Sequence, residues 1–161
     1  MIKMLVMDVD GTLTDGKIFV SDEGDVMKAF DVKDGYGIKF TLKEHGILPA
    51  IITGKISEIV AKRAAALDIT ELHQNILDKE RVLREIGAKH HIDLSEIAYI
   101  GDDVNDLDCI KICGLTGCPA DALDSVKQQV DYVCARNGGH SAVREFIEEI
   151  ISRNRGEKNG T

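Results

Sequence analysis

The sequence predicts an α/β fold, a Rossmann-like doubly wound parallel sheet, from three observations. Short apolar segments typical of buried strands alternate with segments of helical periodicity along almost the whole chain. The connections between them are short, which favours parallel strands covered by helices on both faces. Three apolar segments run into Asp8, Thr53 and Asp102, and sheets of this kind bind ligands at the carboxyl ends of their strands.

The predicted elements follow one another in a regular order. Strands are expected at residues 5–7, 47–52, 71–73, 97–100, 115–118 and 131–134. Helices are expected at residues 35–43, 57–67, 79–89, 105–112, 122–128 and 142–152. Asp34 precedes the first helix and Asp78 caps the third. Pro49 is placed at the first residue of its strand, because proline has no N–H for a ladder.

The domain organisation is simple. Residues 17–30 contain two β-prone runs around an acidic turn with a glycine, which predicts a β-hairpin inserted after the first strand. Residues 1–152 are expected to form one domain, long enough to bury a core. The polar segment 153–161 is expected to be a flexible tail.

The composition of the chain argues against several classes of function. The chain has 161 residues and a net charge of −8, which argues against nucleic-acid binding because phosphate backbones would be repelled. No run approaches the ~18 apolar residues of a membrane span. The beginning of the chain leads directly into a strand, which leaves no room for a cleavable signal peptide. The four cysteines lack metal-binding or redox spacing, so we expect reduced thiols in a cytoplasmic protein.

Two acidic residues, Asp8 and Asp10, lie directly after the first strand, and Gly11 allows the chain to bend there. Three more motifs follow, each at the end of a strand or the start of a helix: Thr53-Gly54, Lys79 and Gly101-Asp102-Asp103. Each alone has a plain structural explanation, such as a polar turn, a solvated lysine or an acidic helix cap. In this order and at these boundaries, they resemble the four-part signature of the haloacid-dehalogenase-like phosphohydrolases.

That resemblance gives each residue a chemical role. Asp8 is the expected nucleophile, which forms an aspartyl-phosphate, and Asp10 is the expected general acid and then base. Asp8 and Asp102 would bind Mg²⁺ through their carboxylates, and the resemblance implies that Asp10 adds its backbone carbonyl. Phosphate or substrate binding is assigned to Gly11, Thr53, Gly54, Lys55 and Lys79. Asp106 is expected to orient Lys79, and Asp103 to support the site or cap a helix.

The gaps between the motifs indicate the branch of the superfamily. The first gap holds a hairpin and one helix, and the second holds one helix and one short strand, so no cap domain fits. The chain resembles the capless 3-deoxy-D-manno-octulosonate 8-phosphate (KDO 8-phosphate) phosphatases. Matching stretches include residues 13–16, 30–38, 51–54, 99–103, 120–122, 138–139 and 142–145. The resemblance implies a sugar-acid phosphate as the substrate and a homotetramer in which the hairpins pack together.

Two alternatives remain open from the sequence. Related enzymes hydrolyse nonulosonate 9-phosphates (N-acylneuraminate or KDN 9-phosphate), but they carry an acid and a lysine where this chain has Lys55 and Ala66. Lys55 could meet a substrate carboxylate or be a solvated helix-start residue. The second alternative is a non-catalytic oligomerisation module related to sialic-acid-activating enzymes, against which the intact catalytic set argues. One departure concerns substrate choice, since His140-Ser141 stands where the octulosonate enzymes have Arg-Gly or Glu-Gly.

Overall fold

The structure, a computed structural model, describes residues 1–159 and has two sheets. The main sheet has six strands in the order β5-β4-β1-β6-β7-β8, and every pair of neighbours is parallel. Its strands are β1 (Met4–Met7), β4 (Leu48–Ile52), β5 (Glu71–His73), β6 (Ile97–Ile100), β7 (Leu115–Cys118) and β8 (Tyr132–Val133). This confirms the predicted doubly wound parallel sheet.

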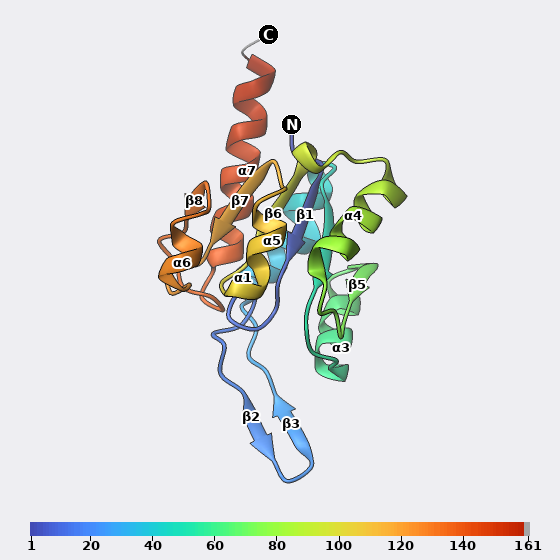
Figure 1. Cartoon of the computed structure of the whole chain (residues 1–161), viewed down its shortest axis with the longest axis vertical. Helices are drawn as coiled ribbons and strands as arrows, with labels where there is room; N and C mark the ends of the chain where they lie inside the picture. Colours follow the sequence, from blue (N-terminus) through green and yellow to red (C-terminus); the bar gives the residue numbers. More distant parts are fainter. Residues whose placement is uncertain (160–161) are drawn as a thin grey trace.

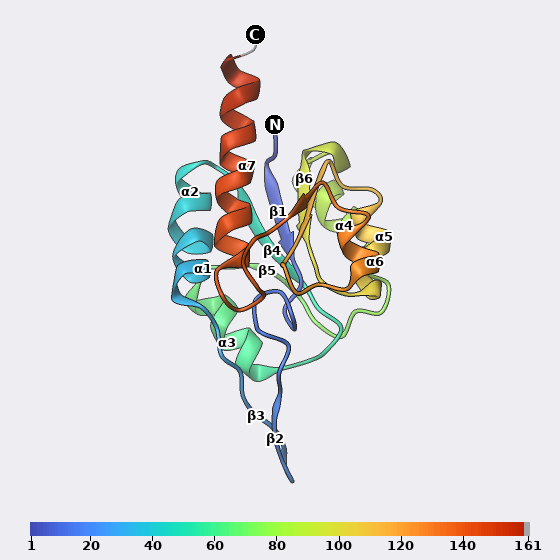
Figure 2. The ribbon, with the colours of Figure 1, turned by 90° about the vertical axis from the view of Figure 1, so that its left-hand side faces the viewer.

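Helices cover both faces of this sheet, as Figure 2 shows. One face carries α1 (Val32–Tyr36), α2 (Leu42–Glu44), α3 (Glu58–Ala66) and α7 (Ala142–Asn159). The other face carries α4 (Lys79–His90), α5 (Leu107–Ile110) and α6 (Asp124–Lys127). Each face has its own apolar core, and the strand side chains alternate between the two: Leu5 and Met7 join one core, Met4 and Val6 the other.

The predicted hairpin is present and stands apart from the main sheet (Figure 1). Strands β2 (Phe19–Ser21) and β3 (Gly24–Met27) pair antiparallel, and every residue of both strands is exposed. Ile18, Phe19, Val20, Val26 and Met27 are exposed large apolar side chains of this segment. An isolated two-stranded ribbon with such a surface is at most marginally stable in water on its own.

The helical segment after the hairpin differs from the prediction. It begins at Val32 rather than Gly35, because the Asp31 side chain accepts a hydrogen bond from the N–H of Lys33 and caps the helix. Asp34 therefore lies inside the helix, where it is buried. Residues Gly37–Thr41 form a π-helical turn between α1 and α2.

Pro49 was expected at the first residue of its strand but is the second residue of β4. The N–H of Leu48 donates to the carbonyl of Lys3, the residue before β1. Backbone groups alternate in direction along a strand, so the nitrogen of Pro49 faces β5 instead. There β5 begins to pair only at Ala50, opposite Glu71. The missing N–H of Pro49 therefore leaves no partner unsatisfied in the ladder.

Helix α7 runs to Asn159 rather than ending at Ser152, so residues 153–159 of the expected tail are helical. The Asn154 amide holds this extension, since it accepts from the N–H of Ile2 at 2.7 Å and donates to the Ile2 carbonyl at 2.9 Å. The last part of the predicted tail, residues 160–161, lies outside the described residues. No helix in the described part of the chain is long and apolar enough to cross a membrane.

Candidate active site

The first acidic loop begins where β1 ends, at the carboxyl edge of the sheet. Asp8 is buried, and its N–H donates to the carbonyl of Ile100 at the end of neighbouring β6. The carbonyl of Val9 accepts three successive N–H groups, from residues 12 to 14, which closes the loop into a tight turn. This turn lies directly beside the end of β6.

Gly11 makes this packing possible. Its φ is +89°, and a β-carbon there would lie 2.0 Å from Oδ2 of Asp102. Any larger residue would collide with that carboxylate. The N–H of Gly11 donates to Oγ1 of Thr14 at 3.2 Å, so it does not point freely at a ligand. Gly11 therefore contributes clearance for Asp102 rather than a phosphate donor.

Lys79 lies between two acidic side chains. Its Nζ is 2.8 Å from Oδ1 of Asp8 and 2.8 Å from Oδ1 of Asp106, and all three side chains are buried. Burial acts to lower the pKa of Lys79, but the two carboxylates outweigh it and raise the pKa. Lys79 is thus a fixed positive charge at the first residue of α4.

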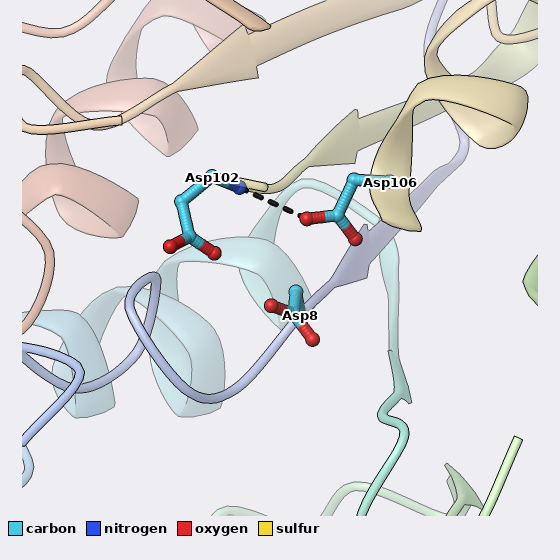
Figure 3. Close-up of side chains that lie close together, drawn as sticks. All are labelled: Asp8, Asp102 and Asp106. Atoms are coloured by element: carbon cyan, nitrogen blue, oxygen red, sulfur yellow. Dashed lines mark hydrogen bonds between the residues drawn. The ribbon is translucent and has the colours of Figure 1, made fainter. Parts of the chain in front are cut away.

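Asp106 is fully engaged in holding the site together. Its Oδ1 accepts from Lys79 and from the Tyr99 hydroxyl at 2.6 Å. Its Oδ2 accepts from the N–H groups of Asp102 at 3.0 Å and Asp103 at 3.2 Å, the first of which is drawn in Figure 3. With four donors on its two oxygens, Asp106 orients Lys79 and the loop after β6.

Asp8 and Asp102 fit a divalent cation. Carboxylate oxygens of Asp8, Asp102 and Asp106 lie within 4.8 Å of one another (Figure 3). Four donors already occupy the oxygens of Asp106, which leaves Asp8 and Asp102 as the two carboxylates with capacity for a cation. Carboxylate oxygens are donors that Mg²⁺ prefers. Oδ1 of Asp102 also accepts from Oγ1 of Thr12 at 3.2 Å, which fixes the direction of its carboxylate.

The electrostatics of this pair also favour a cation. Burial raises the pKa of Asp8 to about 6; Asp106 adds to the rise and Lys79 opposes it. Burial raises the pKa of Asp102 to about 8, and the nearby charges of Asp8 and Asp106 add to the rise. Two carboxylates that are costly to ionise side by side gain most from a divalent positive charge.

A cavity of about 170 Å³ opens beside these residues. It is lined by Asp8, Asp10, Thr53, Gly54, Lys55, Asp103 and Asn105. Thr53 is buried at the end of β4, while Lys55 is exposed at the rim. The structure thus brings all the predicted phosphate- and substrate-binding residues except Gly11 and Lys79 to the wall of one cavity, and Lys79 lies directly behind Asp8.

Asp103 has a capping role as well as a place in the cavity wall. Its side chain accepts from the N–H of Val104 and begins the short 3₁₀ turn Val104–Asp106. Asn105, the middle residue of that turn, is a cavity residue that the sequence analysis missed. Its only signal was its position next to the acidic motif.

A lysine that the sequence analysis missed contacts Asp10. Nζ of Lys28 lies 2.6 Å from Oδ1 of Asp10, and the Lys28 side chain is 1% exposed. Lys28 follows β3 directly, so the end of the hairpin places it beside the loop that carries Asp10. The contact spans 18 residues and follows no local pattern, so sequence periodicity gives no sign of it.

The predicted departure at His140-Ser141 lies in a loop that packs on the catalytic loop. The N–H of Gly139 donates to the carbonyl of Thr12 at 3.2 Å, and the N–H of Gly138 donates to Asp121. A β-carbon on Gly138 would lie 2.0 Å from the Gly11 carbonyl oxygen. The two glycines thus let this loop lie against the loop that carries Asp8 and Asp10.

Comparisons with known proteins agree with this geometry. The profile of the haloacid dehalogenase-like hydrolases matches residues 25–147. The chain is 39% identical over 150 residues to the 3-deoxy-D-manno-octulosonate 8-phosphate phosphatase KdsC of Escherichia coli K12, which covers 93% of this chain and 79% of that protein. The corresponding protein of Yersinia pestis is 38% identical over 150 residues, with 93% and 80% covered.

Solved structures give the same result. The 3-deoxy-D-manno-octulosonate 8-phosphate phosphatase of Moraxella catarrhalis, in complex with a magnesium ion, a phosphate ion and a KDO molecule, superposes with a TM-score of 0.89. It is 41% identical, and the match covers 94% of this chain and 86% of that one. The cobalt-bound deoxy-D-mannose-octulosonate 8-phosphate phosphatase of Haemophilus influenzae has a TM-score of 0.91 and 37% identity, with 94% and 88% covered.

Proposed function

Because the chain belongs to the haloacid dehalogenase-like hydrolases and, within them, to the 3-deoxy-D-manno-octulosonate 8-phosphate phosphatases, we propose that it hydrolyses this sugar-acid phosphate to 3-deoxy-D-manno-octulosonate and phosphate. One observation of the site carries the proposal. Lys79 binds Asp8 and Asp106 at 2.8 Å each, beside the Asp8–Asp102 pair, and Asp8 lines an open cavity. This arrangement holds a nucleophile, a positive charge and a cation site around one point.

The first chemical step uses Asp8 and Asp10. An oxygen of Asp8 attacks phosphorus while the bond from phosphorus to the sugar oxygen breaks. Asp10, which lines the same cavity, gives its proton to that leaving oxygen. The sugar acid leaves as a neutral alcohol at this position, and the phosphoryl group remains on Asp8.

The second step reverses the role of Asp10. Its carboxylate takes a proton from a water molecule, whose oxygen attacks phosphorus while the bond to Asp8 breaks. Lys79 and the Thr53 hydroxyl stabilise the phosphoryl oxygens throughout, together with the N–H groups of Gly54 and Lys55. Neither of these N–H groups donates to another residue in the described part of the chain. They remain available to phosphate.

Mg²⁺ is the proposed cofactor. Asp8 and Asp102 would hold it with their carboxylates and Asp10 with its backbone carbonyl, and it would neutralise charge on the phosphoryl oxygens. The Moraxella catarrhalis structure is a complex with a magnesium ion, which supports this choice.

The open cavity and Lys55 support a substrate that carries both a phosphate and a carboxylate. Lys55 is exposed at the cavity rim and forms no ion pair within residues 1–159, so its ammonium group is available for a substrate carboxylate. Only the hairpin and a helical segment lie between β1 and β4, which leaves the site open.

We further propose that the protein is a homotetramer assembled through its hairpins. The exposed apolar residues of β2 and β3 need a partner, and a second copy of the same ribbon offers a matching surface. The four free cysteines fit the reducing conditions of the cytoplasm, which is the location we propose.

The experiment that tests the substrate measures phosphate release with Mg²⁺ from KDO 8-phosphate and from nonulosonate 9-phosphates. We expect kcat/KM to favour KDO 8-phosphate by about 100-fold, close to 3 kcal/mol of transition-state binding. The opposite preference would move the protein to nonulosonate phosphates. Hydrolysis of neither ester would contradict the enzymatic proposal and favour a non-catalytic assembly module.

A further inference from the structure

The carboxylate of Asp10 is held by a buried lysine from the hairpin. Nζ of Lys28 lies 2.6 Å from Oδ1 of Asp10 and 3.9 Å from Oδ2 of Asp25. The Lys28 side chain is 1% exposed, whereas that of Asp10 is 26% exposed. The buried partner is therefore the lysine, and Asp10 keeps access to the cavity that it lines.

Burial of Lys28 needs an explanation. Removing an ammonium group from water is costly unless a carboxylate compensates for the lost hydration, and surface lysines are usually solvated. Lys28 instead has a buried side chain that ends at Asp10. Its second acidic neighbour, Asp25, is more distant and lies on the same hairpin. The main electrostatic partner of Lys28 is thus the proposed general acid.

The geometry leaves one oxygen of Asp10 free. Lys28 occupies Oδ1, and Oδ2 accepts no hydrogen bond from residues 1–159. A hydrogen bond to one oxygen fixes the rotation of a carboxyl group and therefore the direction of the other oxygen. Proton transfer needs that direction to be correct to within a fraction of an ångström.

We propose that Lys28 is a positioning residue for the reaction: it fixes Asp10 so that the free oxygen of this carboxyl faces the leaving oxygen of the substrate. This inference rests on the proposed function, since it concerns the proton that the leaving alcohol requires. It also makes the hairpin part of the active site, because Lys28 directly follows β3.

Two other roles predict different results. As a purely structural tie, Lys28 would affect the stability of the loop and all reactions of Asp8 equally. As a ligand of the phosphoryl group, it would affect binding of every phosphate ester. A positioning role affects only those esters whose leaving group needs a proton.

The test compares two esters that differ in this need. KDO 8-phosphate leaves as an alkoxide that must be protonated, whereas p-nitrophenyl phosphate leaves as a stable phenolate. The quantity is kcat/KM, which covers steps only up to release of the leaving group. The variants are Lys28→Met, Lys28→Arg and the control Lys17→Met, an exposed lysine at the start of the hairpin.

We expect Lys28→Met to lower kcat/KM for KDO 8-phosphate by about 30-fold, mostly in kcat, as a misplaced general acid would. The value for p-nitrophenyl phosphate should change less than about threefold, because its leaving group needs no general acid. Lys28→Arg, which keeps the charge, should recover most of the loss, and Lys17→Met should match the wild type. Asp10→Asn should show the same selective loss as Lys28→Met, only larger.

An equal loss on both esters, or no loss on either, would overturn the positioning role. If Lys28→Met fails to fold, as judged by circular dichroism, Lys28→Gln takes its place with the same criteria. A wild-type protein that hydrolyses p-nitrophenyl phosphate but not KDO 8-phosphate would contradict the proposed substrate alone. The selective loss is then measured on the nonulosonate 9-phosphate that it does hydrolyse, which is also a phosphate ester of an alcohol.

Discussion

The ammonium group of Lys79 lies 2.8 Å from a carboxylate oxygen of Asp8, although 71 positions separate the two residues in the chain. This contact joins the end of β1 to the start of α4, on a different layer of the fold. It exists because Asp78 caps α4 at that point and Asp106 holds Lys79 from the other side. Asp8 and Lys79 are therefore held in place by one buried network.

Replacement of Lys79 by methionine should abolish most of the activity. The variant loses the positive charge for the phosphoryl oxygens and leaves Asp8 and Asp106 buried without their shared cation. We expect kcat/KM for KDO 8-phosphate to fall by about 10³-fold, measured as phosphate release. The control variant Lys62→Met, at an exposed position of α3, should retain wild-type activity. A Lys79→Met protein whose kcat/KM stays within about tenfold of the wild-type value would refute the role of this charge.

Mg²⁺ should stabilise the protein through Asp102. A ligand that binds only the folded state adds about 2.7 kcal/mol at 100 times its Kd, which a thermal melt with and without Mg²⁺ detects. Chelation by EDTA should stop phosphate release and lower the melting temperature. Asp102→Asn should lose the Mg²⁺-dependent shift, whereas Asp103→Asn, one residue along, should keep it. A normal shift in Asp102→Asn would show that the cation binds elsewhere.

Asp34 should make stability depend on pH. Burial raises its pKa to about 7; the Arg144 N–H, Arg63 and the Arg144 charge lower it, and Asp31 raises it. The folded state therefore binds a proton more tightly than the unfolded chain, so stability falls as the pH rises from about 4 to about 7 and is flat above that. Asp34→Asn keeps an oxygen for the N–H of Arg144 and should remove this dependence.

The measurement for Asp34 is urea unfolding of both proteins between pH 4 and pH 8. As the pH rises across this range, the free energy of unfolding of the wild type should fall by up to about a few kcal/mol relative to that of Asp34→Asn. The unpaired, buried Oδ2 of Asp34 gives the physical reason, because the ionised carboxyl lacks a donor for that oxygen. Parallel pH profiles of the two proteins would contradict the assignment.

Ser141 has a strained backbone conformation, and we expect a hydrogen bond of its side chain to offset the cost of that strain. Its φ is +75°, in the left-handed region that glycine adopts easily. Its hydroxyl donates to Asp31, the capping residue of α1. Ser141→Ala keeps the strain and loses the bond, which should cost about 2 kcal/mol. Ser141→Gly loses the same bond but relieves about 1 kcal/mol of strain, so it should be the milder change in urea unfolding.

The order of stability would be reversed if the hydroxyl contributed nothing and glycine only added disorder to the unfolded chain. Ser141→Ala would then be the more stable of the two variants. Neither substitution touches the cavity wall, so kcat/KM should remain within a few-fold of wild type in both.

The ends of the strands could be predicted because an apolar run followed by a polar residue is a local sequence signal. Asp8, Thr53 and Asp102 each follow an apolar run, and parallel strands bring their carboxyl ends to one edge. Lys79 was predictable because Asp78 marks the start of its helix. The roles assigned to these residues came from the family resemblance, and the structure adds their distances.

Contacts between distant side chains were not predictable. Lys28 reaches Asp10 only because the hairpin returns beneath the catalytic loop, and the sequence shows merely a lysine after a β-prone run. His73 and His90 both hydrogen-bond Glu71, which is buried at the first residue of β5. Burial acts to raise the pKa of Glu71, but hydrogen bonds from Lys89, His90 and His73 outweigh it and hold it at about 2.

Element boundaries failed where tertiary contacts override local signals. The helix after the hairpin begins at the Asp31 cap, and Asp34 lies within it because Arg144 of α7 supplies a donor for its carboxyl. Helix α7 extends past Ser152 because Asn154 binds both backbone groups of Ile2. In each case the deciding partner lies more than a hundred residues away in the chain.

The most direct test of the central claim is to trap the phosphoryl group on Asp8. The wild-type protein is mixed with KDO 8-phosphate and Mg²⁺, quenched during turnover, treated with borohydride and analysed by peptide mass spectrometry. Borohydride reduces an acyl phosphate to an alcohol, so we predict homoserine at position 8 and nowhere else. Phosphate release with an unmodified Asp8, or with reduction at another carboxylate, would contradict the account.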